Sequence, residues 1–512
     1  MPLSAVGRGR GGARWLTPDF SVLFVVVHVV AVLGRAGYEL KDPGVGWHLR
    51  TGRLILETGT LPATDPFSFT AAGREWLNYY WGFEIVSAWL ERAGGLPLVS
   101  AVWMLVYGLI PFLLYRWMVR AGASPLAIFL ALPLAYLVLL SHALDRPHIV
   151  TYVCFTVLVA RLDDVRAGRL APRALWWLPL MAVAWANMHG GFISGLAAVG
   201  VVGAAAGARF VVHRDAKDAR DAVAFAALLV AMTLATLVNP YGVRLHLQAV
   251  EHLRLPSTGY FLEFLSPNFR DGLMAVRYFE VLILAVVAVT GLGWVVLDWS
   301  ALALAVFLLH GALTAVRNMN LFAIVAAPIV ARGLTAALEE YRPSFAARWR
   351  RVADEQTANA AWRVQLPVVA AVVLAATLAG RLPWLTTLDD LQLTRGAAAY
   401  MAAHPDRFER MFNTDALGGA LIYRFWPTLR VFVDDRTVVY GEDFVMNDYF
   451  TVLYGRAGWE AVLDRWAVTA AVMSTSTRCA TLLRESPGWT EVYADDRNLI
   501  VVRAERHADH GT

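Results

Sequence analysis

Residues that could do chemistry recur in short polar segments that separate long apolar stretches of this sequence. The first segment contributes acids and a histidine, and later ones are the motifs LDRPH, ANMHGG, NPYG, EFLSPN and RNMN. Carboxylates can act as general bases, and arginines offer a planar fork to anionic oxygens. Ionisable groups near membrane depth are costly and usually line a cavity or pathway. The segments therefore predict one polar site at a membrane surface.

The acidic candidates for this site lie in the first polar segment. Asp42 precedes a proline and could simply begin a turn. Asp65, in TDPFS, fits a turn or helix cap better than a catalytic role. Glu84 could lie on a solvated face or in a cavity. The other cavity candidates are His48, which could instead anchor an amphipathic interfacial helix, Asn187, Asn239 and Tyr241.

Several familiar catalytic patterns are missing from the sequence. It has no GxxxxGK[ST] phosphate loop, no HExxH helix and no GxSxG or CxxC motif. An ATP-driven pump, a zinc protease and a serine hydrolase are therefore not indicated. A secondary transporter is disfavoured too, because no pair of matching halves with broken spans is apparent.

Membrane helices must position the polar residues. The 512 residues are 58% hydrophobic and 17% charged, whereas soluble proteins are about 45–50% apolar and about 25% charged. About eleven segments are apolar enough to suggest spans: Phe20–Gly34, Pro97–Met118, Ser124–Leu140, Ile149–Leu162, Leu175–Asn187, Phe192–Val212, Ala222–Val238, Tyr278–Val296, Ser300–Val316, Leu321–Ala337 and Gln365–Leu378. The fold class predicted is a mainly α, polytopic membrane protein.

The arginines indicate its orientation. With a cytoplasmic N-terminus, the inner loops hold the basic clusters at residues 8–14, 116–120, 161–173, 209–220 and 342–351. This distribution follows the positive-inside rule, and an odd number of spans then places the C-terminus outside. We expect a multi-pass protein of the cell inner (cytoplasmic) membrane. The net charge of +4 reflects this topology and gives no sign of a nucleic-acid partner.

Two regions make up the predicted organisation. Residues 1–382 form the membrane domain, with a large first outer loop at 37–95, and residues 383–512 form a small extracytoplasmic α/β domain. Strands and helices alternate there; the predicted elements are the strands Arg430–Asp435, Val468–Met473 and Leu499–Arg503, and the helix Trp459–Trp466. We interpret the DDR motif at 434–436 as a turn with a surface ion pair, in preference to a ligand site.

The first outer loop and later motifs resemble a bacterial group of GT-C-like membrane glycosyltransferases. The resemblance rests on DPGVGWHLRTG, LPATDPFSFT and the GREW that follows, then on RPH, WANMHGGF, NPYG and RNMN. LGGALIYRFWP, VFVDDRTVVYGEDF and GWEAVLDRW extend it into the C-terminal region, so that it covers most of the chain.

This resemblance implies an activity and roles for particular residues. GT-C enzymes take a sugar from a polyprenyl-phosphate carrier on the outer face of the membrane. Asp42 is then the best candidate base, with Asp65 and Glu84 as second choices. The candidates for contact with the donor phosphate are Arg146, His148, His189 and Arg317. The implied partners are the lipid-linked sugar donor and an acceptor that is an envelope glycan, lipid or protein.

The sequence departs from the family pattern at two positions. Gly44 stands where the pattern has a second acid, and Gly46 stands where it has its first tryptophan. A divalent metal stays open as a cofactor, but a metal-free site is the simpler choice. Two alternatives also stay open: a polysaccharide polymerase or ligase that uses a diphosphate-linked glycan, and a non-catalytic membrane scaffold in envelope assembly.

Overall fold

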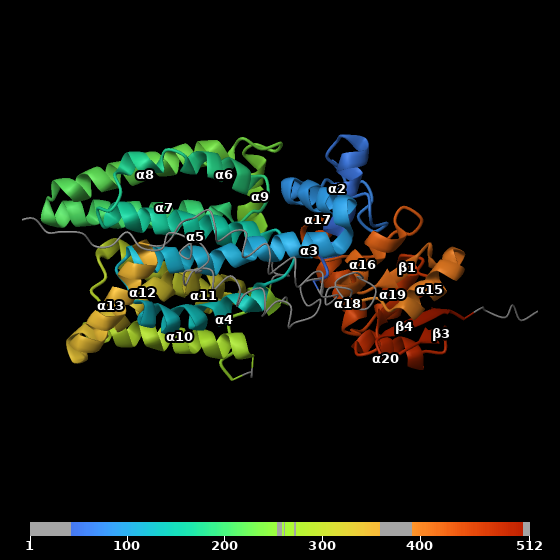
Figure 1. The fold of residues 1–512 in the computed structure, drawn as a ribbon. Coiled ribbons are helices and arrows are strands. Elements are labelled where there is room, and N and C mark those ends of the chain that lie inside the picture. Colours follow the sequence, from blue (N-terminus) through green and yellow to red (C-terminus); the bar gives the residue numbers. More distant parts are fainter. Residues whose placement is uncertain (1–41, 253–258, 261, 271–272, 359–391, 505–512) are drawn as a thin grey trace, which may run out of the picture.

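The computed structural model describes residues 42–252, 259–260, 262–270, 273–358 and 392–504. A long helical bundle lies at one end and a mixed domain of helices and strands at the other (Figure 1). Two predicted spans, Phe20–Gly34 and Gln365–Leu378, lie outside the described residues. So does the predicted boundary between residues 382 and 383.

The bundle and the segments that border it are almost entirely helical. In chain order the elements are α2 (Val45–Thr58), α3 (Trp81–Arg120), α4 (Pro125–Leu139), α5 (His148–Arg166), α6 (Leu178–Ala186), α7 (Phe192–His213), α8 (Ala216–Thr236), α9 (Arg244–His252), α10 (Met274–Gly291), α11 (Trp299–Thr314), α12 (Met319–Tyr341) and α13 (Pro343–Ala358). Short 3-10 turns join some of them, at Leu140–His142, Pro172–Leu175, Leu262–Phe264 and Val316–Asn318.

Six helices of the described residues are long and apolar enough to cross a membrane: Trp81–Arg120, Pro125–His142, Phe192–His213, Ala216–Thr236, Met274–Gly291 and Val316–Tyr341. The predicted multi-pass architecture is confirmed, but the count of eleven spans is not. The span predicted at Leu175–Asn187 falls on α6, which has only 9 residues. That length covers about 14 Å, far less than the hydrocarbon core of about 30 Å. Helix α5 is also not among the six.

Helix α3 bends where it enters the bundle. At the bend Gly95 has φ 72° and ψ −173°, a conformation that only glycine adopts readily. Before the bend α3 packs closely on α2, and a Cβ on Gly52 would lie 2.0 Å from the carbonyl oxygen of Glu84. The close approach of these two helices fixes Glu84 beside α2.

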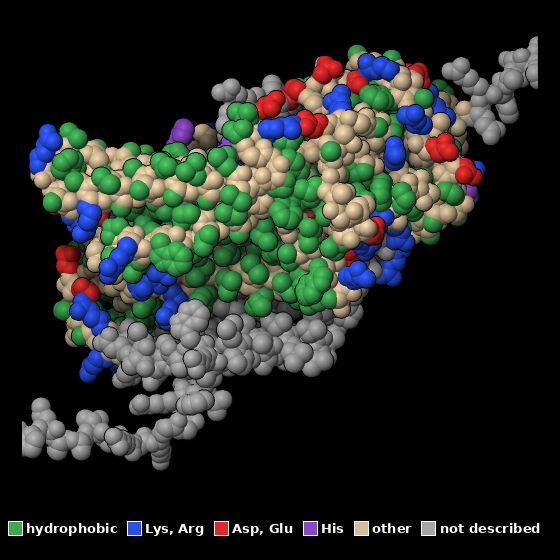
Figure 2. Space-filling view, turned by 90° about the horizontal axis from the view of Figure 1, so that it is seen from above, with side chains coloured by type: hydrophobic (Ala, Val, Ile, Leu, Met, Phe, Trp, Pro, Cys, Tyr) green, Lys and Arg blue, Asp and Glu red, His purple; other side chains and the backbone are tan. Residues whose placement is uncertain are grey.

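The surface has an apolar middle and charged ends. In Figure 2 hydrophobic side chains cover the bundle, and Lys and Arg gather at the end away from the C-terminal domain. Ion pairs at that end join Asp163 and Asp164 to the predicted inner-loop arginines Arg120, Arg161, Arg166 and Arg169. The predicted inner-loop clusters at 116–120 and 161–173 thus share one end of the bundle.

The C-terminal domain has a four-stranded sheet in the order β1-β2-β4-β3, with β1 and β2 parallel and the other pairs antiparallel. Its elements are α15 (Arg395–Ala403), β1 (Met411–Asn413), α16 (Asp415–Phe425), α17 (Thr437–Tyr440), a π-helical turn (Phe444–Tyr449), α18 (Phe450–Leu453), α19 (Trp459–Arg465), β2 (Ala470–Ser474), α20 (Arg478–Glu485), β3 (Trp489–Ala494) and β4 (Asn498–Arg503). The strands predicted near β2 and β4 are present. The strand predicted at Arg430–Asp435 is wrong, because this segment forms only an isolated bridge, from Val431 to Ser68.

The first polar segment packs into the core of the C-terminal domain. Trp47, Phe67 and Trp76 are buried in the same hydrophobic cluster as the sheet. Helices α2 and α16 touch through their backbones: a Cβ on Gly46 would lie 2.1 Å from the carbonyl oxygen of Gly419. Gly46 is therefore required by this contact, and its departure from the family pattern has a packing cause.

Replacing Gly419 by alanine is expected to destabilise the protein. A Cβ at this position would lie 1.9 Å from the carbonyl oxygen of Pro43, so the backbone of one helix must shift. Overpacking of this kind costs about 1–3 kcal/mol. The thermal unfolding midpoint of the purified protein should fall. Gly458→Ala is the comparison variant: its Cβ would meet no atom within 4 Å, so a change in its midpoint reports only the strain of a positive φ. An unchanged midpoint for Gly419→Ala would contradict the close packing of α2 on α16.

Candidate functional site

Arg146 lies at the centre of three carboxylates. Its Nε is 3.2 Å from Asp42 Oδ1, one Nη is 3.6 Å from Glu263 Oε2, and the other is 3.4 Å from Asp435 Oδ2. The four side chains come from the turn before α2, the loop before α5, the Leu262–Phe264 turn and the C-terminal domain. The site therefore forms only when the bundle and the C-terminal domain are packed together.

Asp42 and Asp435 meet at Gly44. A Cβ on Gly44 would lie 3.0 Å from an oxygen of each carboxylate. The Gly44 amide donates to Asp42 Oδ1 at 2.8 Å, and Trp47 Nε1 donates to Asp435 Oδ1 at 2.5 Å. The position that lacks an acid in the sequence is thus approached by an acid from another segment of the chain. A Cβ at residue 44 would crowd both carboxylates, which would have to move by a few tenths of an ångström.

Burial and charge set the protonation of this cluster. Burial raises the pKa of Asp435 to about 7, and Arg146 opposes this shift. The pKa of Asp42 is also raised by burial, against the opposing effects of Arg146 and the Gly44 amide. Burial disfavours the charge on Arg146, but its three carboxylate neighbours outweigh it and raise the pKa of Arg146. Near neutral pH the arginine is charged, while the two aspartates compete for a proton.

Arg317 joins the same cluster through Glu263. One Nη of Arg317 is 3.7 Å from Glu263 Oε1, and its guanidinium lies 4.6 Å from the ring centroid of Phe264. Glu263 therefore stands between two arginines, Arg146 and Arg317. Both contacts are longer than the 2.7–2.9 Å typical of a charge-assisted hydrogen bond. Two guanidinium groups here face one loosely held anion.

The two predicted histidines lie on neighbouring segments. His189 Nδ1 accepts a hydrogen bond from the Gly191 amide at 3.0 Å, so the neutral ring carries its proton on Nε2. Thr151 Oγ1 lies 2.6 Å from the same nitrogen. Burial, together with the charges of Arg317 and Arg146, lowers the pKa of His189 to about 3. His148 Nε2 bonds to the carbonyl oxygen of His142 at 2.6 Å.

Glu84 is buried and paired with His48. His48 Nδ1 lies 3.0 Å from Glu84 Oε1, and Asn78 Nδ2 donates to the other oxygen at 2.5 Å. Burial lowers the pKa of His48 well below its usual value, so His48 is neutral. Glu84 therefore lies in the interior and has no solvated face.

Asp65 belongs to a different buried network, which fastens the first polar segment to the C-terminal domain. Its carboxylate accepts the amides of Phe67 and Ser68, as a turn-capping residue does, and pairs with Arg436 at 2.8 Å. Arg436 also pairs with Asp434 and lies 4.5 Å from the ring centroid of Trp76. The interpretation of the DDR motif as a surface ion pair is wrong, because Asp434 and Arg436 are buried.

The three remaining candidates fasten loops to helices. The Asn187 amide donates to the carbonyl oxygens of Val183 and Val238, and its Oδ1 accepts from Trp81 Nε1. Asn239 closes the NPYG turn by bonds to its own backbone neighbours. The Tyr241 hydroxyl accepts from the Asn78 amide at 3.0 Å. These residues support the segment that carries Glu84.

Sequence reasoning missed the roles of Glu263 and Asp435. Asp435 is the last residue of the predicted strand Arg430–Asp435, and the ends of strands in α/β domains often carry ligand-binding residues. This position was a signal that could have indicated Asp435. Nothing local linked either acid to Arg146. In the described part of the chain, no group of three or more His, Cys, Asp or Glu side chains is placed to hold a metal ion; the three acids instead surround Arg146.

No protein-family model and no curated protein matches the sequence. Among solved structures, the chain is similar to the Archaeoglobus fulgidus oligosaccharyltransferase tethered with an acceptor peptide, at 13% identity and a TM-score of 0.56, covering 89% of this chain and 68% of that one. It also matches the apo form of that enzyme, at 12% identity, a TM-score of 0.50, and 89% and 69% coverage.

A further match is ArnT from Cupriavidus metallidurans bound to undecaprenyl phosphate, at 15% identity, covering 95% of this chain and 98% of that one. Its TM-score is 0.42. At the identities of the oligosaccharyltransferase matches, the likeness is one of fold. The chain therefore has the GT-C fold of membrane glycosyltransferases, as its sequence motifs predicted.

Proposed function

We propose that this protein is a glycosyltransferase that moves a hexose or pentose from a polyprenyl-phosphate carrier to an acceptor hydroxyl. The acceptor is an envelope glycan, lipid or protein. The observation that carries the proposal is the Arg146 cluster, where two arginines and two aspartates from distant segments meet at one end of the bundle. The GT-C fold, which this chain shares with an oligosaccharyltransferase, supports the same reaction class.

Arg146 and Arg317 are the proposed contacts for the donor phosphate. Guanidinium groups bind phosphate oxygens with paired hydrogen bonds. The carboxylate of Glu263 already occupies an anion position between Arg146 and Arg317. Its contacts are long, so a phosphate can displace it and bond more closely. The Nε2 proton of His189 is a further donor for a phosphate or sugar oxygen.

Asp42 is the proposed general base. It takes the proton of the acceptor hydroxyl as that oxygen attacks the anomeric carbon of the sugar. The bond from that carbon to the carrier phosphate breaks, and its electron pair leaves with the phosphate, which the arginines stabilise. Attack opposite the leaving group inverts the anomeric carbon. Asp435 shares the proton of Asp42 and thereby adjusts its basicity.

The proposed location follows from the basic clusters. The arginine-rich end of the bundle would lie in the cytoplasm and the Arg146 cluster on the outer face of the inner membrane, together with the C-terminal domain. The lipid-linked sugar would reach the cluster from the outer leaflet.

Incubation of the purified protein with a panel of radiolabelled polyprenyl-phosphate sugars and envelope extract tests the proposal. Transfer of label from at least one donor to an envelope acceptor is the expected result. If no donor is bound and no label moves, the scaffold alternative gains and the proposed function fails.

Asp435→Asn should change how activity depends on pH. In the wild-type protein, the pKa of about 7 for Asp435 means that the coupled pair holds a proton below neutral pH. Transfer measured as kcat/KM should therefore fall as the pH drops through about 7. Asparagine removes one negative charge beside Asp42, so this fall should move to lower pH. An unshifted profile would contradict proton sharing between Asp42 and Asp435.

A further inference from the structure

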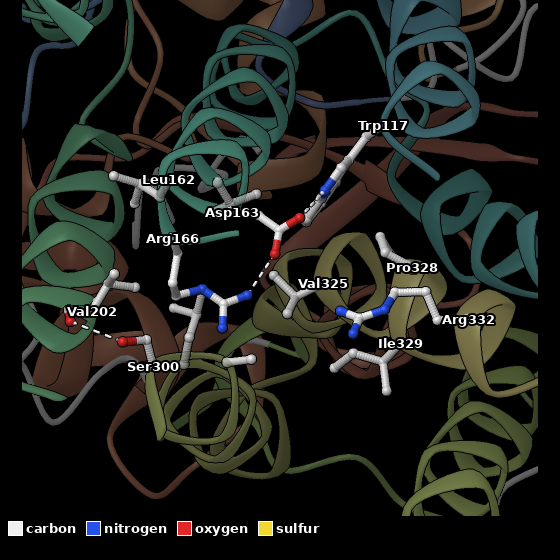
Figure 3. A pocket seen from close by; sticks show the side chains of 13 residues that line it. Trp117, Leu162, Asp163, Arg166, Val202, Ser300, Val325, Pro328, Ile329 and Arg332 are labelled. Atoms are coloured by element: carbon white, nitrogen blue, oxygen red, sulfur yellow. Dashed lines mark hydrogen bonds and ion pairs between the residues drawn. The ribbon is translucent and has the colours of Figure 1, made fainter. Parts of the chain in front are cut away.

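A pocket lies among the bundle helices beside the ion pair of Arg166 and Asp163, and Figure 3 shows the side chains that line it. Helices α3, α5, α7, α11 and α12 line it, and its volume is about 40 Å³. This is more than the 10–15 Å³ or so that a single water needs on the same kind of measure. The walls are mostly apolar, with Val159, Leu162, Val202, Leu304, Val325 and Ile329 among them.

Two guanidinium groups point toward one another in this apolar pocket (Figure 3). Arg166, at the end of α5, forms ion pairs with Asp163 and Asp298. Arg332, on α12, has no hydrogen-bond or ion-pair partner among the residues that the structure describes. The pocket thus holds one compensated and one uncompensated positive charge.

The position of Arg332 makes its missing partner significant. It shares the pocket with Asp163 and Arg166, whose ion pair lies at the charged end of the bundle. A guanidinium group beside mostly apolar walls is costly unless it finds a partner or water. Arginines near helix ends can reach outward to the interface, but this one points into the pocket (Figure 3). A counter-ion between Arg332 and Arg166 would remove the cost.

We propose that this pocket binds a phosphoryl anion between Arg332 and Arg166. A phosphate ester supplies the negative charge and the acceptor oxygens that guanidinium groups bind best. The pocket is separate from the Arg146 cluster, because α5 runs from His148, beside that cluster, to Arg166, about 27 Å along the helix. The anion comes from a lipid headgroup or from free phosphate.

Lipid binding by the delipidated full-length protein in detergent tests this site. The ligands are dioctanoyl phosphatidylglycerol, dioctanoylglycerol, which has the same chains without phosphate, and inorganic phosphate. We expect phosphatidylglycerol to raise the thermal unfolding midpoint and dioctanoylglycerol not to do so. Arg332→Gln should weaken binding about tenfold or more, while Arg332→Lys, which keeps the charge, should retain part of it.

Arg220→Gln is the matched control, because Arg220 is an exposed arginine at the same end of the bundle, 61% accessible and paired with Asp221. It should bind phosphatidylglycerol as the wild type does. Stabilisation by inorganic phosphate as well, lost in Arg332→Gln, would support the site and identify free phosphate as a ligand. Equal responses to both dioctanoyl lipids, or equal responses of the wild type and Arg332→Gln, would overturn it. If a variant fails to fold, the wild-type protein alone still tests the site, because its responses to phosphatidylglycerol and to dioctanoylglycerol can be compared.

Discussion

Replacing Asp42 by asparagine is expected to lower sugar transfer by about 10²- to 10⁴-fold, the usual contribution of a general base. Asparagine has the shape of aspartate and can still accept the hydrogen bond from the Gly44 amide, but it cannot take a proton. Donor binding should change little, because Arg146 and Arg317 remain. The initial rate of label transfer and the affinity for the donor, measured in the same preparation, separate these two effects.

Asp406→Asn is the matched control for this variant. Asp406 is an exposed aspartate of the C-terminal domain, outside the Arg146 cluster, so its replacement should leave transfer unchanged. Both variants should unfold at temperatures close to that of the wild type. Wild-type activity in Asp42→Asn would remove Asp42 as the base and shift attention to Asp435 or Glu84.

Replacing Arg146 by glutamine should have the second large effect, and it should impair both donor binding and stability. Arg146 is the positive group that Asp42 and Asp435 share, so its loss leaves buried carboxylates without compensation. Breaking a buried pair in this way costs about 3–5 kcal/mol. Loss of a group that stabilises the leaving phosphate should lower the rate by about 10²- to 10³-fold. The unfolding midpoint and the rate of transfer report the two effects separately.

Two variants control for these effects. Arg484→Gln breaks an exposed ion pair with Glu491, and such pairs contribute about 0–1 kcal/mol, so its stability should match the wild type. Arg317 contacts only Glu263 among the acids of the cluster, and its side chain is about one-third exposed. Arg317→Gln should therefore weaken donor binding with little loss of stability. If Arg146→Gln kept both stability and activity, the cluster would have no central role.

Much of the fold follows from local sequence patterns. The apolar stretches become bundle helices, and the amphipathic pattern of GWHLRTGRLILETG becomes helix α2. Individual spans are less certain, since α6 is apolar enough to suggest a span yet too short to cross alone. Whether an apolar helix crosses a membrane depends on its length and neighbours as well as its composition.

The candidate site could be predicted only in part. Asp42, Arg146 and Arg317 stand out as polar residues beside apolar helices, and they do converge. Asp435 lies 388 residues from Trp47, to which it bonds, and no local pattern reports such a pairing. No local pattern explains Gly44 and Gly46 either; in the sequence they are only the positions where the acid and the tryptophan of the family pattern are missing. In the structure each gives room to a group of the C-terminal domain, a carboxylate at Gly44 and a backbone carbonyl at Gly46.

The central claim is sugar transfer from a monophosphate carrier at the Arg146 cluster, and product analysis tests it most directly. Purified wild-type protein and Asp42→Asn would each be given the same sugar on a polyprenyl monophosphate and on a polyprenyl diphosphate, with envelope acceptor. The account predicts that only the wild type transfers label, that it does so from the monophosphate, and that one polyprenyl phosphate is released for each sugar moved. Transfer from the diphosphate alone, or equal transfer by both proteins, would contradict it.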